Sequence, residues 1–138
     1  MSVPDLPMSD TIKASPTLVG VTFVAVYVDD YERAFTFYNG LLGLQKSFDM
    51  GPNSCFLTIN DDVGLFIEGG NEPATVTPKT VRASFGLTAS SVAAMYRTLR
   101  DAGVRIVHEA GPQDMGGGQA WFQCYDPAGN LIEIVGEL

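Results

Sequence analysis

The chain has 138 residues and a formal net charge of -8, with 46% hydrophobic and 17% charged residues. This length and composition predict one globular domain with its own core and exclude long disordered regions. The 8 lysines and arginines are scattered along the chain, which argues against a nucleic-acid surface and favours a neutral, cationic or small ligand.

The first residues resemble no targeting signal. MSVPDLPMSDTIKASP lacks the basic leader and apolar stretch of a signal peptide, and no window is apolar enough to span a membrane. We therefore expect a cytoplasmic protein with no membrane partner. Residues 1–18 are expected to form an N-terminal arm, either disordered or covering a partner, and residues 19–138 a single domain.

The first half of the domain predicts a strand, a helix and three more strands. FVAVYVDDYERAFTFYNGLLGL alternates apolar residues, then offers an aspartate pair as a helix cap, and Gly43 is typical of a helix end. The apolar positions at helical spacing are Ala34, Phe37, Tyr38 and Leu41. The predicted strands that follow are roughly 44–50, 54–60 and 64–68.

The second half repeats this plan. RASFGLTASSVAAMYRTLRDAGV predicts a strand, a cap at Ser90 or Ser91 and a helix ending at Gly103. Both Asp30 to Gly43 and Ser90 to Gly103 span 13 residues. Apolar residues recur at Val92, Met95, Tyr96 and Leu99, and the later strands are predicted at roughly 104–109, 119–125 and 130–135.

The duplication predicts the fold class. We expect an α+β protein of two tandem βαβββ modules that form a curved, cup-like mixed sheet with the helices on its outer face. The modules are 19–69 and 81–138, and the Gly/Pro/Thr-rich residues 70–80 are the linker.

Two similar segments place a glutamate at the end of a strand. DDVGLFIE ends at Glu68, and DPAGNLIE ends at Glu133. Strand alternation alone would direct such a side chain into water, and turn chemistry explains the shared aspartate and glycine. Neither explains why both segments end on glutamate.

The alternation of apolar residues predicts which side chains line the cup. In the first strand the valines form the face covered by a helix, which leaves Phe23, Ala25 and Tyr27 for the cup. In the fifth strand the same argument selects Arg82, Ser84 and Gly86. Phe66 and Trp121 would complete an aromatic site with few polar groups, although each could equally belong to a core.

Three further features of the sequence allow only less specific predictions. Cys55 and Cys124 lie in apolar runs and are expected to be buried free thiols rather than a disulfide or zinc site. His108 is expected near a strand end with a local hydrogen bond. The loop 111–118, GPQDMGGG, would be a flexible hairpin connection or a flap over a bound molecule.

Two motifs resemble the vicinal oxygen chelate superfamily, which includes glyoxalase I, extradiol dioxygenases and bleomycin-binding proteins. They are VYVDDYERAFTFYNGLLGL and YDPAGNLIEI, and the resemblance covers about residues 20–136. It implies metal ligands on the first and last strands of each module, with Glu133 and Glu68 at the last-strand positions. The first-strand positions, usually His or Gln, fall on Phe23 and, by the face argument, Arg82. The resemblance also implies a homodimer.

This incomplete ligand set favours a protein without a metal cofactor, because two carboxylates without imidazole hold a first-row metal weakly. Arg82 could replace the metal charge by pairing with a glutamate, or could face only water. We expect a protein that binds a small apolar or aromatic molecule at Phe23, Tyr27, Phe66, Arg82, Ser84, Trp121 and Glu133.

Three alternatives remain open. The first is an enzyme of the same superfamily, a lyase, isomerase or dioxygenase, that uses Glu133 or Glu68 as a general acid or base. The second is a divalent-metal enzyme with Glu68 and Glu133 as ligands. The third is a protein with no small-molecule site.

Overall fold

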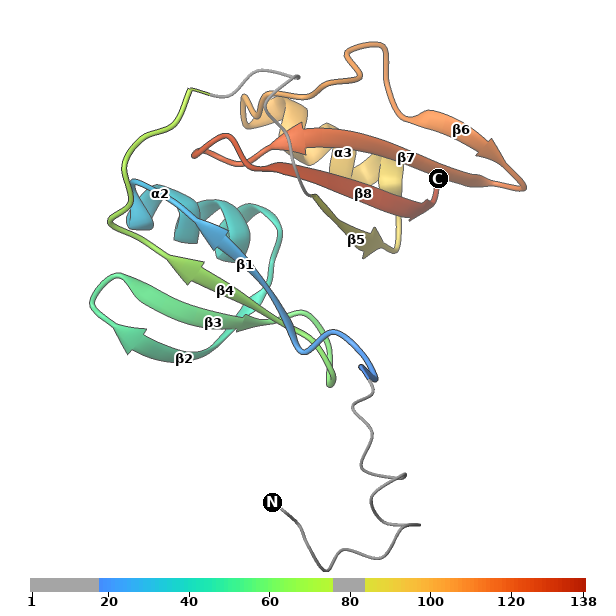
Figure 1. Cartoon of the computed structure of the whole chain (residues 1–138). Helices are drawn as coiled ribbons and strands as arrows, with labels where there is room; N and C mark the ends of the chain where they lie inside the picture. Colours follow the sequence, from blue (N-terminus) through green and yellow to red (C-terminus); the bar gives the residue numbers. More distant parts are fainter. Residues whose placement is uncertain (1–17, 76–83) are drawn as a thin grey trace, which may run out of the picture.

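The structure is a computed structural model that describes residues 18–75 and 84–138 (Figure 1). Most of the expected N-terminal arm, residues 76–80 of the expected linker, and Arg82 lie outside the described residues.

The first module forms a four-stranded sheet with a helix on one face (Figure 1). Strand β1 is parallel to β4, and the other neighbours are antiparallel, in the order β1-β4-β3-β2. The elements are β1 (Phe23–Tyr27), α2 (Tyr31–Phe35), η1 (Thr36–Leu41), β2 (Gln45–Gly51), β3 (Ser54–Thr58) and β4 (Gly64–Glu68).

The second module repeats this topology in a sheet of its own, in the order β5-β8-β7-β6. Its elements are β5 (Phe85–Ala89), α3 (Val92–Asp101), β6 (Gln113–Gly116), β7 (Gln119–Tyr125) and β8 (Leu131–Glu137). The predicted tandem βαβββ fold is therefore confirmed, with the strands divided between two four-stranded sheets.

The two helices have the same kind of N-terminal cap, but their lengths from cap to terminal glycine differ by one residue. Asp30 Oδ1 accepts a hydrogen bond from the Arg33 backbone N–H at 3.1 Å, and Ser91 Oγ accepts one from the Ala94 N–H at 3.1 Å. Because Ser91 is the second cap, the spacing from Ser91 to Gly103 is one residue shorter than the spacing from Asp30 to Gly43. The extra residue of the first module lies in the π-helix η1, where a helix accommodates a single insertion.

The sixth strand is not where the sequence predicted it. Of the expected strand 104–109, only Ile106 pairs with β7, through a single bridge to Cys124. Regular pairing resumes at β6, inside the segment 111–118 that was expected to be a loop. Gly111, at φ 121°, and Pro112, which has no N–H to donate, separate the two stretches.

The buried side chains of both modules form one core on the helix-covered faces of the sheets. Its largest fully buried members include Tyr38, Phe122, Leu57, Leu65, Ile67 and Leu99. Tyr38 Oη also donates a buried hydrogen bond of 2.7 Å to Asp126 Oδ2 in the turn between β7 and β8. This contact fixes the first helix against the second module.

None of the helices in residues 18–75 and 84–138 combines the length and the apolar composition of a membrane span.

Candidate ligand-binding site

The face of the first sheet opposite its helix carries a row of phenylalanines. Strand pairing places Phe66 of β4, Phe56 of β3 and Phe48 of β2 side by side. Neighbouring ring centroids in this row are 4.9 and 5.1 Å apart, and Phe23 of β1 packs edge-on against Phe56 at 5.5 Å. Phe23 is 47% exposed, Phe48 52% and Tyr27 61%, so the chain itself leaves this aromatic face open.

Phe48 and Phe56 were not among the predicted site residues. The alternation within SCFLTIN could have found Phe56, because Cys55 and Leu57 on either side of it are buried against the helix. Phe48 was harder to find, because β2 is irregularly paired and its register shifts between Lys46 and Phe48.

Glu68 lies at one end of this face. It is half-buried, pairs with Tyr27 of β1 and with Ser54 of β3, and accepts a hydrogen bond of 3.2 Å from Ser54 Oγ. Its carboxylate is therefore anchored to the sheet beside an exposed tyrosine.

The open face of the second sheet is more polar. Glu133 of β8 lies between Gly86 of β5 and Gln123 of β7, and Gln123 Nε2 is 3.5 Å from Glu133 Oε1. The position of Gly86 confirms the predicted face of the fifth strand. Since Gly86 has no side chain, one side of the Glu133 carboxylate is left unobstructed.

Ser84 and Trp121 extend the polar face in opposite directions along the strands. Ser84 is exposed, and its hydroxyl donates to the Leu131 carbonyl at 3.1 Å. Trp121 is half-buried and pairs with Val135 of β8, the residue two positions beyond Glu133. The structure thus brings Trp121, Glu133 and Ser84 to one sheet, and Phe23, Tyr27, Phe66 and Glu68 to the other.

His108 also lies on the open face of the second sheet, a position that the sequence did not predict. Its Nδ1 accepts the Gln123 backbone N–H at 3.2 Å, which confirms the expected local hydrogen bond. Its ring lies edge-on to Trp121 with centroids 4.7 Å apart. Because Nδ1 is an acceptor, the proton of the neutral ring resides on Nε2. The interruption between Ile106 and β6, which places His108 there, had no clear signal in the sequence.

The structure assigns Phe23 a different counterpart in the second module from the one expected from the sequence. Phe23 lies seven residues before the cap Asp30, and Ser84 lies seven residues before the cap Ser91. The counterpart of Phe23 is therefore Ser84, not Arg82, whose side chain lies outside the described residues.

The two glutamates are not equivalent in the repeat. Glu68 pairs with Tyr27, three residues before the helix cap Asp30. Glu133 pairs with Gly86, five residues before the helix cap Ser91. The structural counterpart of Glu68 is thus Val135, and that of Glu133 is Phe66. The similarity of DDVGLFIE and DPAGNLIE reflects two turns of similar chemistry, displaced by two residues relative to the repeat.

A shared metal does not fit these residues. Among residues 18–75 and 84–138, no group of three or more His, Cys, Asp or Glu side chains is arranged to hold one. The first-strand positions carry a phenyl ring and a hydroxyl already bound to a carbonyl. The two carboxylates belong to separate sheets, in different rows of the repeat.

Both cysteines are buried free thiols, as expected. Burial and the nearby Asp126 raise the pKa of Cys124 from 9.0 to about 12. Burial also raises the pKa of Cys55, against an opposing hydrogen bond with Tyr31. Neither thiol is exposed or activated as a nucleophile.

Two tandem βαβββ modules with one open face each define the class of two-module α+β proteins of the glyoxalase type. A family profile described as the Glyoxalase/Bleomycin resistance protein/Dioxygenase superfamily matches residues 20–134, and the chain belongs to this superfamily. No curated protein matches the sequence.

Solved structures share the fold at low sequence identity. A lactoylglutathione lyase from Agrobacterium tumefaciens is 19% identical with a TM-score of 0.64, over 88% of this chain and 96% of that one. A superfamily member from Sphaerobacter thermophilus DSM 20745 is 24% identical with a TM-score of 0.66, over 87% and 98%. An integron cassette protein from V. cholerae is 20% identical with a TM-score of 0.63, over 88% and 98%.

Proposed function

We propose that this protein binds a planar aromatic molecule, neutral or cationic, between an aromatic face and an acidic face, without a metal cofactor. The observation that carries this proposal is the exposed row of phenylalanines on the first sheet. An open aromatic surface of this kind gains free energy when a flat apolar ligand covers it.

The second sheet supplies the polar contacts. Glu133 and the imidazole of His108 flank Trp121 and Gln123, and Glu137 lies further along β8 on the same face. A carboxylate there favours a cationic or hydrogen-bond-donating ligand, in keeping with the net charge of -8. Small-molecule sites commonly combine apolar walls with a few such polar groups.

We propose further that a cytoplasmic homodimer completes the site. Phe23, Tyr27 and Phe48 remain exposed in the single chain, and the cavities of about 560 and 430 Å³ in its described part are lined by other residues. A cup made from the first sheet of one chain and the second sheet of its partner would cover the phenylalanines with the Trp121 face.

The first experiment measures metal content and ligand binding together. Untagged protein, purified without chelator, is analysed by elemental mass spectrometry and titrated with ethidium, a planar aromatic cation. Trp121, the only tryptophan of the chain, reports binding through its fluorescence. We expect less than a tenth of an equivalent of metal and saturable quenching. Near-stoichiometric zinc, nickel, manganese or iron would refute the metal-free proposal.

Variants then test the two faces. Phe48→Ser on the first sheet and Glu133→Gln on the second should each weaken ethidium binding by roughly tenfold, the loss of one aromatic or charged contact. Asp101→Asn is the matched control, because it removes the same charge from the exposed end of α3, on the helix-covered side of the second sheet. Equal weakening by the control would mean that ethidium responds only to overall charge.

Mixing two variants tests the dimer. Phe48→Ser and Glu133→Gln chains are unfolded together in urea and refolded as a mixture. If the cup spans two chains, each mixed dimer has one site with both wild-type faces, so tight binding returns in part. If each cup lies within one chain, no site is restored.

Acid–base catalysis is the second candidate, because His108 and Glu133 contact the same residue, Gln123. A binder of neutral ligands should tolerate Glu133→Gln, whereas an enzyme that transfers a proton through Glu133 should lose turnover with its substrate affinity little changed.

A further inference from the structure

A cavity of about 560 Å³ lies where the two modules meet and away from both open faces. Its first wall is the helix α2–η1, with Glu32, Arg33 and Phe37. Its second wall is the segment around Arg105 together with Tyr125 and the turn that follows it. This volume lies within the range of small-molecule sites, roughly 300–1,000 Å³.

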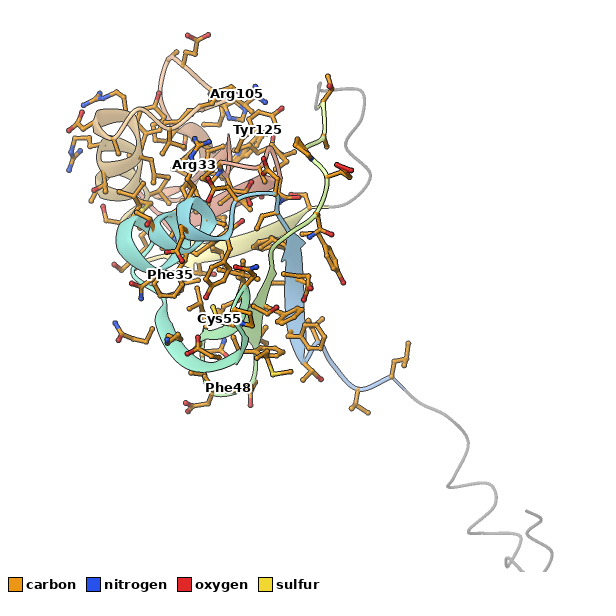
Figure 2. All side chains as sticks on the ribbon, turned by 90° about the vertical axis from the view of Figure 1, so that its left-hand side faces the viewer. Arg33, Phe35, Phe48, Cys55, Arg105 and Tyr125 are labelled. Atoms are coloured by element: carbon orange, nitrogen blue, oxygen red, sulfur yellow. The ribbon has the colours of Figure 1, made fainter. Side chains whose placement is uncertain are left out.

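Each module contributes one arginine to this cavity. The guanidinium carbon of Arg105 lies 3.9 Å from the centroid of the Tyr125 ring, in a cation–π contact. Figure 2 shows Arg33 of α2 on the same side of the molecule, next to Arg105 and Tyr125. Stacking on the ring restrains the Arg105 guanidinium and leaves its N–H groups free to donate.

Neither arginine is neutralised within the described part of the chain. The ion pairs between described residues join Lys46 to Asp49 and Arg100 to Asp101, and no described residue accepts a hydrogen bond from the Arg33 or Arg105 side chain. Both guanidinium groups thus keep N–H donors without an acceptor among the described residues, in a chain of net charge -8.

The carboxylates on the cavity do not replace a bound anion. Asp126 already accepts four hydrogen bonds, from Tyr38 Oη, the backbone N–H groups of Ala128 and Asn130, and Asn130 Nδ2. These occupy the acceptor positions of a carboxylate. Glu32 is exposed on the first turn of α2 and makes no ion pair with a described residue.

We propose that this cavity binds an amphipathic organic anion, with its carboxylate or phosphate held by Arg33 and Arg105. Its apolar body lies against Phe37 and neighbouring aliphatic side chains. Guanidinium groups match the geometry of both head groups through paired N–H donors. Because the arginines come from different modules, the bound anion links them and stabilises their packing. This site is independent of the proposed aromatic site.

The test titrates the full chain with phenyl phosphate and benzoate, with benzyl alcohol as the neutral probe, and follows backbone amides by NMR. We expect saturable shifts of the amides around residues 33 and 105, no change at the Trp121 indole, and no saturable response to benzyl alcohol. Shifts confined to Trp121, or an equal response to benzyl alcohol, would overturn the proposal.

Charge removal provides the second readout. The double variant Arg33→Gln and Arg105→Gln should weaken anion binding by roughly tenfold or more, as expected when charged hydrogen bonds are lost. Lys46→Gln with Arg97→Gln is the matched control, because it removes two positive charges from exposed positions that line neither this cavity nor the neighbouring one. Equal weakening in both variants would show that binding follows net charge alone and would refute the site.

Discussion

Tyr38 of η1 donates a buried hydrogen bond of 2.7 Å to Asp126, 88 positions later in the chain, and thereby joins the helix of the first module to the last turn of the second. The phenol is fully buried, and Asp126 is 4% exposed. The same aspartate organises the turn through Ala128 and Asn130. One carboxylate therefore holds both a turn and the junction between the modules.

Tyr38→Phe should destabilise the fold by about 1–3 kcal/mol, because it leaves a buried carboxylate oxygen with one fewer donor. Urea unfolding followed by circular dichroism measures the change, with an unaltered m-value as evidence that the fold persists. Tyr27→Phe is the control, since that hydroxyl is on an exposed side chain. An equal loss in both variants would contradict the role of the Asp126 contact.

The protein should lose stability at alkaline pH. Burial, and then Asp126, raise the pKa of Tyr38 well above its usual 10.0. The folded state thus favours the protonated phenol, whose contribution is complete below pH 10 and declines as the pH rises toward the folded-state pKa. Tyr38→Phe should reduce this dependence, so the stability difference between variant and wild type should narrow from pH 8 to about pH 11.

Cys124 should resist thiol reagents in the native protein. A pKa raised from 9.0 to about 12 lowers its thiolate population at pH 8 by roughly a thousandfold, and the side chain is fully buried. Reaction with a chromogenic disulfide should be slow in buffer and complete within minutes in guanidinium chloride. Rapid native labelling of Cys124, located by peptide mass spectrometry, would contradict the burial of this thiol.

Two glycines on the β5–β8 pair should respond in opposite ways to alanine. A methyl group at Gly136, whose φ is 149°, would meet the backbone carbonyl oxygen of Ala89. Gly136→Ala should therefore destabilise strongly, by several kcal/mol on the order of a core defect. At Gly86 the nearest atoms are 3.9 Å away, so Gly86→Ala should fold normally.

The Gly86→Ala methyl group would nevertheless lie beside Glu133. Under the proposed function it should weaken ethidium binding several-fold without changing the midpoint of thermal unfolding. Thermal scans and Trp121 fluorescence titrations on the same samples separate the two effects, and unchanged binding would place the ligand away from Glu133.

The duplicated βαβββ plan, the helix caps and the covered faces of the strands could all be predicted from the sequence. These depend on local spacing: an Asp or Ser before a helical repeat caps the helix, and apolar alternation selects the buried face. Most predicted strands lie within a few residues of their observed positions, and Gly86 faces Glu133 as expected.

The strand registers and the junctions between elements could not be predicted, because they depend on packing in three dimensions. Strand pairing showed that Glu68 and Glu133 occupy different rows, because the resemblance of their segments reflects turn chemistry, whereas register follows from which residues pair across the sheet. The cavity with Arg33 and Arg105, and the contact of His108 with Trp121, unite residues far apart in the chain. Such contacts leave no local pattern, since they arise where separate elements pack together.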